Sequence, residues 1–352
     1  MLKRGSTIGI LGGGQLGRMM AVAAAQLGYR CIGYSPEGDN VAAAVCEDFF
    51  TNDWDDKDAL AAFAARCDVV TWEFENVPVE TARAFPADCI FPDPRALETA
   101  QDRLSEKRFV ENLGGRPAAY AKVDSRTDLE AAADRLGAPG ILKTRRDGYD
   151  GKGQWRIMSG RDAAGLKMPD AAAIYEGFVE FSAEFSVILV RGQNGEVRFW
   201  DSARNTHEGG VLAASLLPAG KVVDAQVEEA RKLAGKVAQA LNYVGVLTLE
   251  FFATHEGPIF NEMAPRVHNS GHWTIEGAAT SQFENHIRAV AGLPLGDTRT
   301  IAEAVEMRNI LGTEIEGAHA FLADADTHLH DYGKSEVREG RKMGHLTRLT
   351  RA

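Results

Sequence analysis

Two glutamates in the C-terminal half have a spacing that could hold a metal ion. Glu250 and Glu262 lie in apolar runs that flank the polar stretch 254–257. If these runs form a hairpin centred near Glu256, the two side chains face each other with Cβ atoms about 5 Å apart. Carboxylates this close repel each other unless a cation, such as Mg²⁺ on nucleotide phosphates, lies between them, and Asn261 would add a neutral oxygen. The alternative is that one glutamate faces solvent on an edge strand.

A polar loop from Lys143 to Gln154 is a second candidate site, because it separates two strand-like runs. Three glycines and three basic residues follow Lys143. Glycines let backbone N–H groups approach an anion closely, and the cations offset its charge. The composition favours a flap over a triphosphate, although a hairpin that merely happens to be basic is the alternative. It is not a Walker A loop, since no G-K-[ST] sequence opens a helix.

The first loop, Gly12-Gly13-Gly14-Gln15-Leu16-Gly17, fits G-x-G-x-x-G between a strand and a helix. This arrangement is typical of phosphate binding at a helix N-terminus. An NAD site would also need an acidic residue about 20 positions further on, but the second strand ends in Tyr34-Ser35. The loop can therefore hold a substrate phosphate. Glycines that serve only close strand–helix packing are the alternative.

Polar residues crowd the stretch 264–273, directly after the second glutamate run. This density is typical of an anion- or substrate-binding loop. His268 and His272 are four residues apart, as in some zinc sites, but Gly271 and the lack of an H-E-x-x-H pattern argue against a zinc helix. Each histidine taken singly also fits a structural loop.

The C-terminal tail is a local basic cluster on an acidic chain. It contains Lys334, Arg338, Arg341, Lys342, His345 and Arg348. Arg and Lys are the usual ligands of a phosphate ester, so the tail could bind one. A solvated basic edge strand that discourages aggregation is the alternative.

The elements that must position these residues fall into three groups. Short strands alternate with helices over the first hundred residues, including a short strand at 89–91, which predicts a parallel sheet covered on both faces. A smaller mixed pattern from 101 to 179 predicts a separate lobe. Long strands dominate from 180 onward, with hairpins around 192–195 and 254–257 and a last long helix at 274–291. We expect an α/β and α+β protein with domains at 1–100, 101–179 and 180–352.

Composition narrows the function classes. The chain has 352 residues and a formal net charge of -11, which argues against a nucleic-acid binder because a phosphate backbone needs a basic face. No stretch approaches the roughly 18 apolar residues of a membrane span, and no signal peptide is recognisable at the start. The four cysteines are scattered without a C-x-x-C pair, as expected of thiols in a reducing cytoplasm.

Together these motifs resemble one family, the 5-(carboxyamino)imidazole ribonucleotide synthases of the ATP-grasp superfamily, over nearly the whole chain. The most specific stretches are 12–19, 148–154, 261–273 and 340–346. The resemblance implies a three-domain ATP-grasp fold with an N-terminal parallel-sheet domain, a small lid lobe and a C-terminal mixed-sheet domain. ATP would lie between the small lobe and the C-terminal domain. A homodimer is expected, as in the family.

The resemblance also assigns site residues. Nucleotide contacts fall on Arg103, Lys143, Gly148, Tyr149, Asp150, Gly151, Lys152, Gly153, Gln154, Glu176, Gly177, Phe178, Val179, Glu184, His207, Asn261 and Glu262. Mg²⁺ falls on Glu250 and Glu262. The ribonucleotide phosphate and ribose should meet Gln15, Leu16, Glu73, Lys334, Arg341 and Lys342. Bicarbonate and the amine should react near Tyr149, Asp150, Lys152, Arg266, His268 and Asn269.

The implied reaction carboxylates the amine of 5-aminoimidazole ribonucleotide with ATP and bicarbonate, through carboxyphosphate, in purine synthesis. Bicarbonate is a poor electrophile, and its phosphorylation supplies a good leaving group. Positive groups that hold two anions together should therefore carry most of the catalysis. The alternatives are a formate-dependent glycinamide ribonucleotide transformylase, a biotin carboxylase, an NAD-dependent oxidoreductase and a non-catalytic nucleotide-binding regulator.

Overall fold

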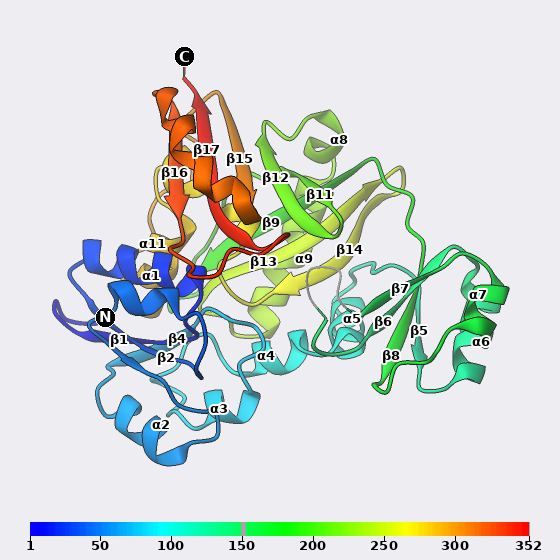
Figure 1. Ribbon diagram of the computed structural model, residues 1–352, viewed down its shortest axis with the longest axis horizontal. Helices are drawn as coiled ribbons and strands as arrows, with labels where there is room; N and C mark the ends of the chain where they lie inside the picture. The colour runs from blue at the N-terminus through cyan, green and yellow to red at the C-terminus, as the bar shows by residue number, and fades with distance from the viewer. Residues whose placement is uncertain (149–152, 352) are drawn as a thin grey trace.

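The computed structural model describes residues 1–148 and 153–351 (Figure 1). Its first sheet has four parallel strands in the order β3-β2-β1-β4. Its elements are β1 (Thr7–Leu11), α1 (Gln15–Gln26), β2 (Arg30–Tyr34), η1 (Val41–Val45), β3 (Asp48–Phe50), α2 (Lys57–Ala64), β4 (Val69–Trp72) and α3 (Val79–Arg83). All residues of β1 are buried, as expected of a central parallel strand covered on both faces. The predicted parallel sheet is confirmed.

The short strand expected at 89–91 does not form. Only Ile90 makes an isolated bridge, to Val70. Pro92 follows at once and has no N–H to donate to a neighbouring strand, so pairing stops after one residue.

The second sheet is a separate small lobe, seen at the right of Figure 1. Its four antiparallel strands run in the order β5-β8-β6-β7. The chain reaches it through α4 (Arg95–Ala100) and α5 (Arg103–Asn112), and α5 is capped by Asp102, which accepts from the N–H groups of Leu104 and Ser105. The lobe comprises β5 (Tyr120–Val123), α6 (Arg126–Leu136), β6 (Gly140–Thr144), β7 (Gln154–Ile157), α7 (Gly160–Gly165) and β8 (Ala173–Gly177).

The third sheet is antiparallel and runs in the order β14-β13-β9-β11-β12-β15-β17-β16, with β10 paired to β9. Its strands are β9 (Ala183–Arg191), β10 (Val197–Phe199), β11 (Arg204–Glu208), β12 (Val211–Leu217), β13 (Gly245–Thr254), β14 (Gly257–Ala264), β15 (Ala304–Leu311), β16 (Thr327–Asp331) and β17 (Lys342–Thr350). Its helices are α8 (Lys221–Asp224), α9 (Val227–Ala240), η2 (Asn269–Gly271), α10 (Thr274–Gly277), α11 (Gln282–Val290) and η3 (Gly312–Ala323).

The prediction of one long helix at 274–291 is wrong. Helix α10 stops at Gly277, Ala278 is extended and bridges to Thr300, and a new helix, α11, starts after Ser281. The Ser281 side chain accepts from the Glu284 N–H, which is the usual cap of a helix N-terminus. The apolar periodicity on both sides of the break hid it.

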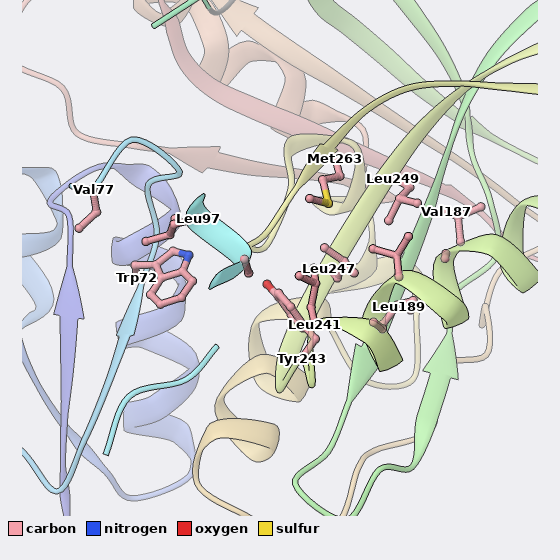
Figure 2. Close-up of a cluster of buried hydrophobic side chains, with 14 of the residues drawn as sticks. Trp72, Val77, Leu97, Val187, Leu189, Leu241, Tyr243, Leu247, Leu249 and Met263 are labelled. Carbon is pink, nitrogen blue, oxygen red and sulfur yellow. The ribbon is translucent and has the colours of Figure 1, made fainter. Parts of the chain in front are cut away.

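The N-terminal sheet and the large sheet share one hydrophobic core. Figure 2 shows Trp72 and Leu97 from the N-terminal part on the side that faces Tyr243 and Leu247, with Leu249 of β13 further away, and all five belong to one buried cluster. The indole N–H of Trp72 also donates to the Pro265 carbonyl, at 2.9 Å. The strand that carries the glutamates is therefore fixed against the first domain.

We expect Trp72→Phe to cost about 1–3 kcal/mol, since it leaves the buried Pro265 carbonyl without that donor. The matched control is Trp54→Phe, at a tryptophan that is only partly buried. Thermal melting of both variants checks the prediction, and equal losses would contradict it.

Candidate functional site

The predicted glutamate hairpin is present, and Glu250 on β13 pairs directly with Glu262 on β14. The hairpin was expected to be centred near Glu256, but Thr254 pairs with Gly257, so its centre lies between residues 255 and 256. A β-bulge corrects the offset: the register shifts after Glu250 and leaves Asn261 without a partner opposite it. The bulge interrupts the alternation of faces beside Glu262, where Asn261 was expected to contribute an oxygen.

Each of the two glutamates has a positive or polar neighbour. Glu262 Oε2 lies 2.9 Å from Arg103 Nη1 on α5, and Glu250 Oε1 lies 3.2 Å from His268 Nε2. Glu250 is buried, whereas 43% of the Glu262 side chain is exposed on the outermost strand. Glu262 is thus partly open to solvent, as the edge-strand alternative held, but its carboxylate remains in the site.

The electrostatics of the pair are asymmetric. Burial and then the charge of Glu262 raise the pKa of Glu250 to about 7. Burial opposes ionisation of Glu262, but Arg103 outweighs it and lowers the pKa of Glu262. The pair therefore holds a proton near neutrality that a bound cation would displace.

Lys143 lies in a buried ion cluster at the base of the small lobe. Its Nζ is 2.8 Å from Glu176 Oε2, and Nζ of Lys107 is 3.2 Å from the other oxygen. Burial opposes ionisation of Glu176, but Lys107 and Lys143 lower its pKa to about 2. Lys107 was missed from sequence, although it lies one helical turn after Arg103 on α5 and so shares its face.

The expected flap joins β6 to β7, and Tyr149, Asp150, Gly151 and Lys152 lie outside the described residues. At its edges, the Gly148 carbonyl accepts from Arg103 Nη2 and the Gly153 carbonyl accepts from the Thr144 N–H. Arg145 and Arg146, expected to offset an anion, both pair with Asp102, at 2.6 and 3.6 Å. Their charge is therefore already partly neutralised.

Arg266 and the following loop lie beside the glutamate pair. Arg266 Nε forms a close ion pair with Glu75 of the first domain. His268 is held at its backbone by Gln282, which accepts from its N–H and donates to its carbonyl, and its Nδ1 bonds to Ser270 Oγ. Burial and then the charge of Arg266 lower the pKa of His268 well below its usual value, so the ring is neutral.

Asn269 is half-buried, but its side-chain oxygen and nitrogen are both buried and lack a hydrogen-bond partner among the described residues. Buried polar atoms are usually paired, so this amide is positioned for a ligand. His272, the other histidine of the suspected zinc pair, bonds instead to Tyr332. The two histidines thus belong to different networks.

The glycine loop was expected to hold a substrate phosphate, but two of its N–H groups already have a partner within the chain. The N–H groups of Gly14 and Gly17, at the start of α1, both donate to the carboxylate of Glu73, at 2.8 and 3.3 Å. A ligand phosphate at these amides would have to displace Glu73. Leu16 is buried, so only its backbone could contact a ribonucleotide, whereas Gln15 is half-buried beside it.

Three residues of the basic tail, Lys342, His345 and Arg348, lie on the interior strand β17, whereas Lys334, Arg338 and Arg341 lie in the loop before it. β17 pairs with β15 on one side and β16 on the other, so the edge-strand alternative is wrong. Arg341 Nη2 lies 2.7 Å from Asp39 Oδ2, and Lys334 Nζ donates to the Lys342 carbonyl. Burial and then Arg341 lower the pKa of Lys334 to about 8. Asp39 was missed, and no local pattern marks a partner 302 residues away.

The remaining predicted nucleotide contacts lie on the large sheet and at the end of the small lobe. Glu184 on β9 and His207 on β11 face each other, with Oε2 and Nδ1 2.6 Å apart. Burial opposes ionisation of His207, but Glu184 raises its pKa. Phe178, at the end of the lobe, is 62% exposed, between Gly177 and Val179.

Comparison with known proteins explains this arrangement. Residues 5–101 match the ribonucleotide synthetase preATP-grasp domain, 108–283 the ATP-grasp domain, and 306–352 the phosphoribosylaminoimidazole carboxylase C-terminal domain. An N5-carboxyaminoimidazole ribonucleotide synthase of Brucella melitensis is 50% identical, over 99% of this chain and 97% of the relative. The chain belongs to the N5-carboxyaminoimidazole ribonucleotide synthase family. One from Pseudomonas aeruginosa is 45% identical, over 97% and 93%.

Solved N5-carboxyaminoimidazole ribonucleotide synthases have the same fold. The Thermus thermophilus structure is 45% identical, with a TM-score of 0.89 and coverage of 98% of this chain and 94% of that one. An Aspergillus clavatus structure, in complex with ADP and 5-aminoimidazole ribonucleotide, is 29% identical, with a TM-score of 0.89 and coverage of 99% and 94%. The predicted ATP-grasp fold is confirmed.

Membership of the N5-carboxyaminoimidazole ribonucleotide synthase family makes the chain an ATP-dependent ligase of purine biosynthesis. The transformylase, biotin carboxylase, oxidoreductase and regulator alternatives are not favoured. Within residues 1–148 and 153–351, no helix combines the length and apolar character that a bilayer crossing demands.

The raised pKa of Glu250 predicts a pH effect on stability. A carboxyl with a folded pKa near 7 and an unfolded value near 4.5 binds more protons when folded, so stability falls as pH rises between those values. Glu250→Gln removes this dependence. Without nucleotide or metal, the melting temperature of the unaltered chain should fall relative to that of Glu250→Gln from pH 5 to 8. Parallel curves would contradict the assignment.

Proposed function

We propose that this enzyme carboxylates the amine of 5-aminoimidazole ribonucleotide, with bicarbonate as the carboxyl source, ATP as the phosphoryl donor and Mg²⁺ at Glu250 and Glu262. The observation that carries the proposal is the direct pairing of these two glutamates, with His268 of the Arg266 loop 3.2 Å from Glu250. The Aspergillus complex, which contains ADP and this ribonucleotide, supports the choice of substrates.

The donor set at Glu250 and Glu262 fits Mg²⁺, because opposed carboxylates offer the oxygen ligands that this ion prefers. Within the described part of the chain, no three His, Cys, Asp or Glu side chains gather as a complete metal cage. Nucleotide phosphates and water would therefore complete the coordination. When bound, Mg²⁺ supplies neutralising charge to the phosphates.

The proposed reaction has two steps. An oxygen of bicarbonate attacks the γ-phosphorus of ATP, and the bond to ADP breaks, which gives carboxyphosphate. The amine nitrogen of the ribonucleotide then attacks the carboxyl carbon, phosphate leaves with the C–O bond electrons, and the nitrogen loses a proton. Both steps bring anions together, so fixed cations and N–H donors should lower the barriers most.

Three side chains would hold the reacting groups. Lys143, already ordered by Glu176, would contact the phosphates. Arg266 would bind the carboxylate of bicarbonate, and its ion pair with Glu75 fixes its orientation beforehand. The unpartnered amide of Asn269 would hydrogen-bond the same anion.

The ribonucleotide would bind across the first domain and the tail. Gln15, the Leu16 backbone and Glu73 would contact its ribose, and Lys334, Arg341 and Lys342 its phosphate. The pairing of Arg341 with Asp39 brings these two parts of the chain together.

We also propose a homodimer, a cytoplasmic location and domain limits of 1–100, 101–179 and 180–352, each of which encloses one sheet. The four cysteines are free thiols, which suits a reducing compartment. The helix expected at 274–291 was a candidate to support this dimer, but seven of the nine α11 residues are buried within one chain, so α11 offers little free surface for a partner. Sedimentation velocity tests the assembly.

The deciding experiment measures ADP release with the ribonucleotide, bicarbonate and Mg²⁺ each omitted in turn. The proposal expects release to need all three, with one carbamate formed per ADP. Full ADP release with formate in place of bicarbonate, or with glycinamide ribonucleotide, would overturn it.

A further inference from the structure

Tyr332 is a buried residue that no part of the proposed mechanism uses. It follows β16, is 1% exposed, and its N–H donates to the Met343 carbonyl of β17. Its hydroxyl and its ring contact two different parts of the site. These contacts suggest that it joins the two substrate-binding regions.

The hydroxyl of Tyr332 bridges two histidine rings. It lies 3.2 Å from Nδ1 of His272 and 3.0 Å from Nδ1 of His345. Burial lowers the pKa of both histidines well below the usual value, so both rings are neutral. A hydroxyl has one hydrogen, so it donates to one Nδ1 and accepts from the other. The bridge therefore requires opposite tautomers on the two rings and fixes their orientation.

His272 connects this bridge to the loop proposed to bind bicarbonate. Its N–H donates to the Asn269 carbonyl, and it directly follows η2, which carries Asn269. The rings of His272 and His345 lie 4.6 Å apart, and His345 stacks on His330, which pairs with Glu276. The loop backbone thus rests on a packed group of rings rather than on solvent.

The ring of Tyr332 supports the region proposed to bind the ribonucleotide phosphate. Nζ of Lys334 lies 5.6 Å from the ring centroid, within the range of a cation–π contact. The same Nζ donates to the Lys342 carbonyl. Tyr332 therefore contacts Lys334 of the tail through its ring. Its hydroxyl contacts His345 on β17 and also the carboxyl loop, which is the loop 266–272 proposed to bind bicarbonate.

We infer that Tyr332 is a positioning residue that sets the carboxyl loop, through His272, relative to the phosphate-binding tail, through Lys334. This inference rests on the proposed function, because it assigns those two regions to the two substrates. If the inference holds, the hydroxyl and the ring of Tyr332 make separable contributions to the use of the two substrates. The hydroxyl governs the use of bicarbonate, and the ring governs binding of the ribonucleotide.

Two substitutions separate these contributions. Tyr332→Phe keeps the ring but removes the bridge, so we expect kcat at fixed bicarbonate to fall about tenfold, the effect of one lost hydrogen bond, with the KM for the ribonucleotide unchanged. ADP release without carboxylation should rise as a fraction of the total. Tyr332→Leu should in addition raise the KM for the ribonucleotide about threefold, since the cation–π contact is lost.

Tyr34→Phe is the matched control. Tyr34 is also fully buried, and its hydroxyl donates to the Asp53 carbonyl inside the first domain. It should lose stability comparable to Tyr332→Phe but keep both kinetic constants. His272→Gln provides a second test if Tyr332→Phe does not fold, and it should reproduce the fall in kcat with an unchanged ribonucleotide KM.

The outcomes are distinguishable. Unchanged kcat and coupling in Tyr332→Phe, or equal kinetic losses in Tyr34→Phe, would overturn the inference. Failure of the unaltered enzyme to carboxylate the ribonucleotide would instead overturn the proposed function. A fall in kcat in Tyr332→Phe that Tyr34→Phe lacks, with only Tyr332→Leu affecting the ribonucleotide KM, is the expected result.

Discussion

Glu262→Gln should reduce Mg²⁺-dependent ADP release by about 10²–10³-fold or more. The substitution removes one of two opposed carboxylates while keeping the size of the side chain. It also leaves Arg103 without the partner that lies 2.9 Å away, so a surplus positive charge would lie at the proposed cation-binding site. Titration with Mg²⁺ at fixed ATP, followed by ADP release, measures the effect.

Glu256→Gln is the control for this prediction. Glu256 lies in the turn of the same hairpin with 67% of its side chain exposed, so it shares the local structure without facing the site. Its variant should have the activity of the unaltered enzyme. If Glu262→Gln retained its Mg²⁺ dependence and rate, the metal assignment would be wrong.

Arg266→Gln should reduce bicarbonate-dependent ADP release by about 10²–10³-fold, because it removes the cation proposed to hold the developing anion. It should also cost about 3 kcal/mol of stability, since it strands the largely buried carboxylate of Glu75. The two effects can be separated. The loss of stability arises from the broken ion pair with Glu75, whereas the loss of ADP release arises from the missing contact with bicarbonate.

The double variant Glu75→Gln with Arg266→Gln makes that separation. It removes both charges, so melting temperature should recover while bicarbonate-dependent activity stays low. Arg299→Gln, at an exposed pair with Asp297 that leaves 72% of the arginine side chain open to solvent, serves as a control for loss of an arginine and should change neither measurement. Recovery of activity in the double variant would contradict a direct role for Arg266.

The parts of the site that could be predicted from sequence depend on local geometry. The Glu250–Glu262 pairing follows from a short turn between two apolar strands, and the compensating bulge preserved it. Lys143 was placed correctly at the end of β6 because a strand run stops there. Such features involve few residues and short loops, so periodicity is enough to find them.

The parts that could not be predicted are contacts between distant segments. Glu75 reaches Arg266 across 191 residues, and Asp39 reaches Arg341 across 302. Each acid lies in a loop with no distinctive pattern, and its importance arises only from the packing of the first domain on the large sheet. The break between α10 and α11 was missed for a related reason, since a tertiary bridge at Ala278 overrides helical periodicity.

The interior position of β17 affects the order in which the site can assemble during translation. β16 pairs only with β17 in the described sheet, and β15 needs β17 on one side, yet β17 leaves the ribosome after both. The hairpin of β13 and β14 and its neighbour β9 are synthesised well before it and can pair on their own. The hairpin proposed to bind the metal and nucleotide can therefore form early, whereas the tail proposed to bind the ribonucleotide phosphate must wait for β17 to insert.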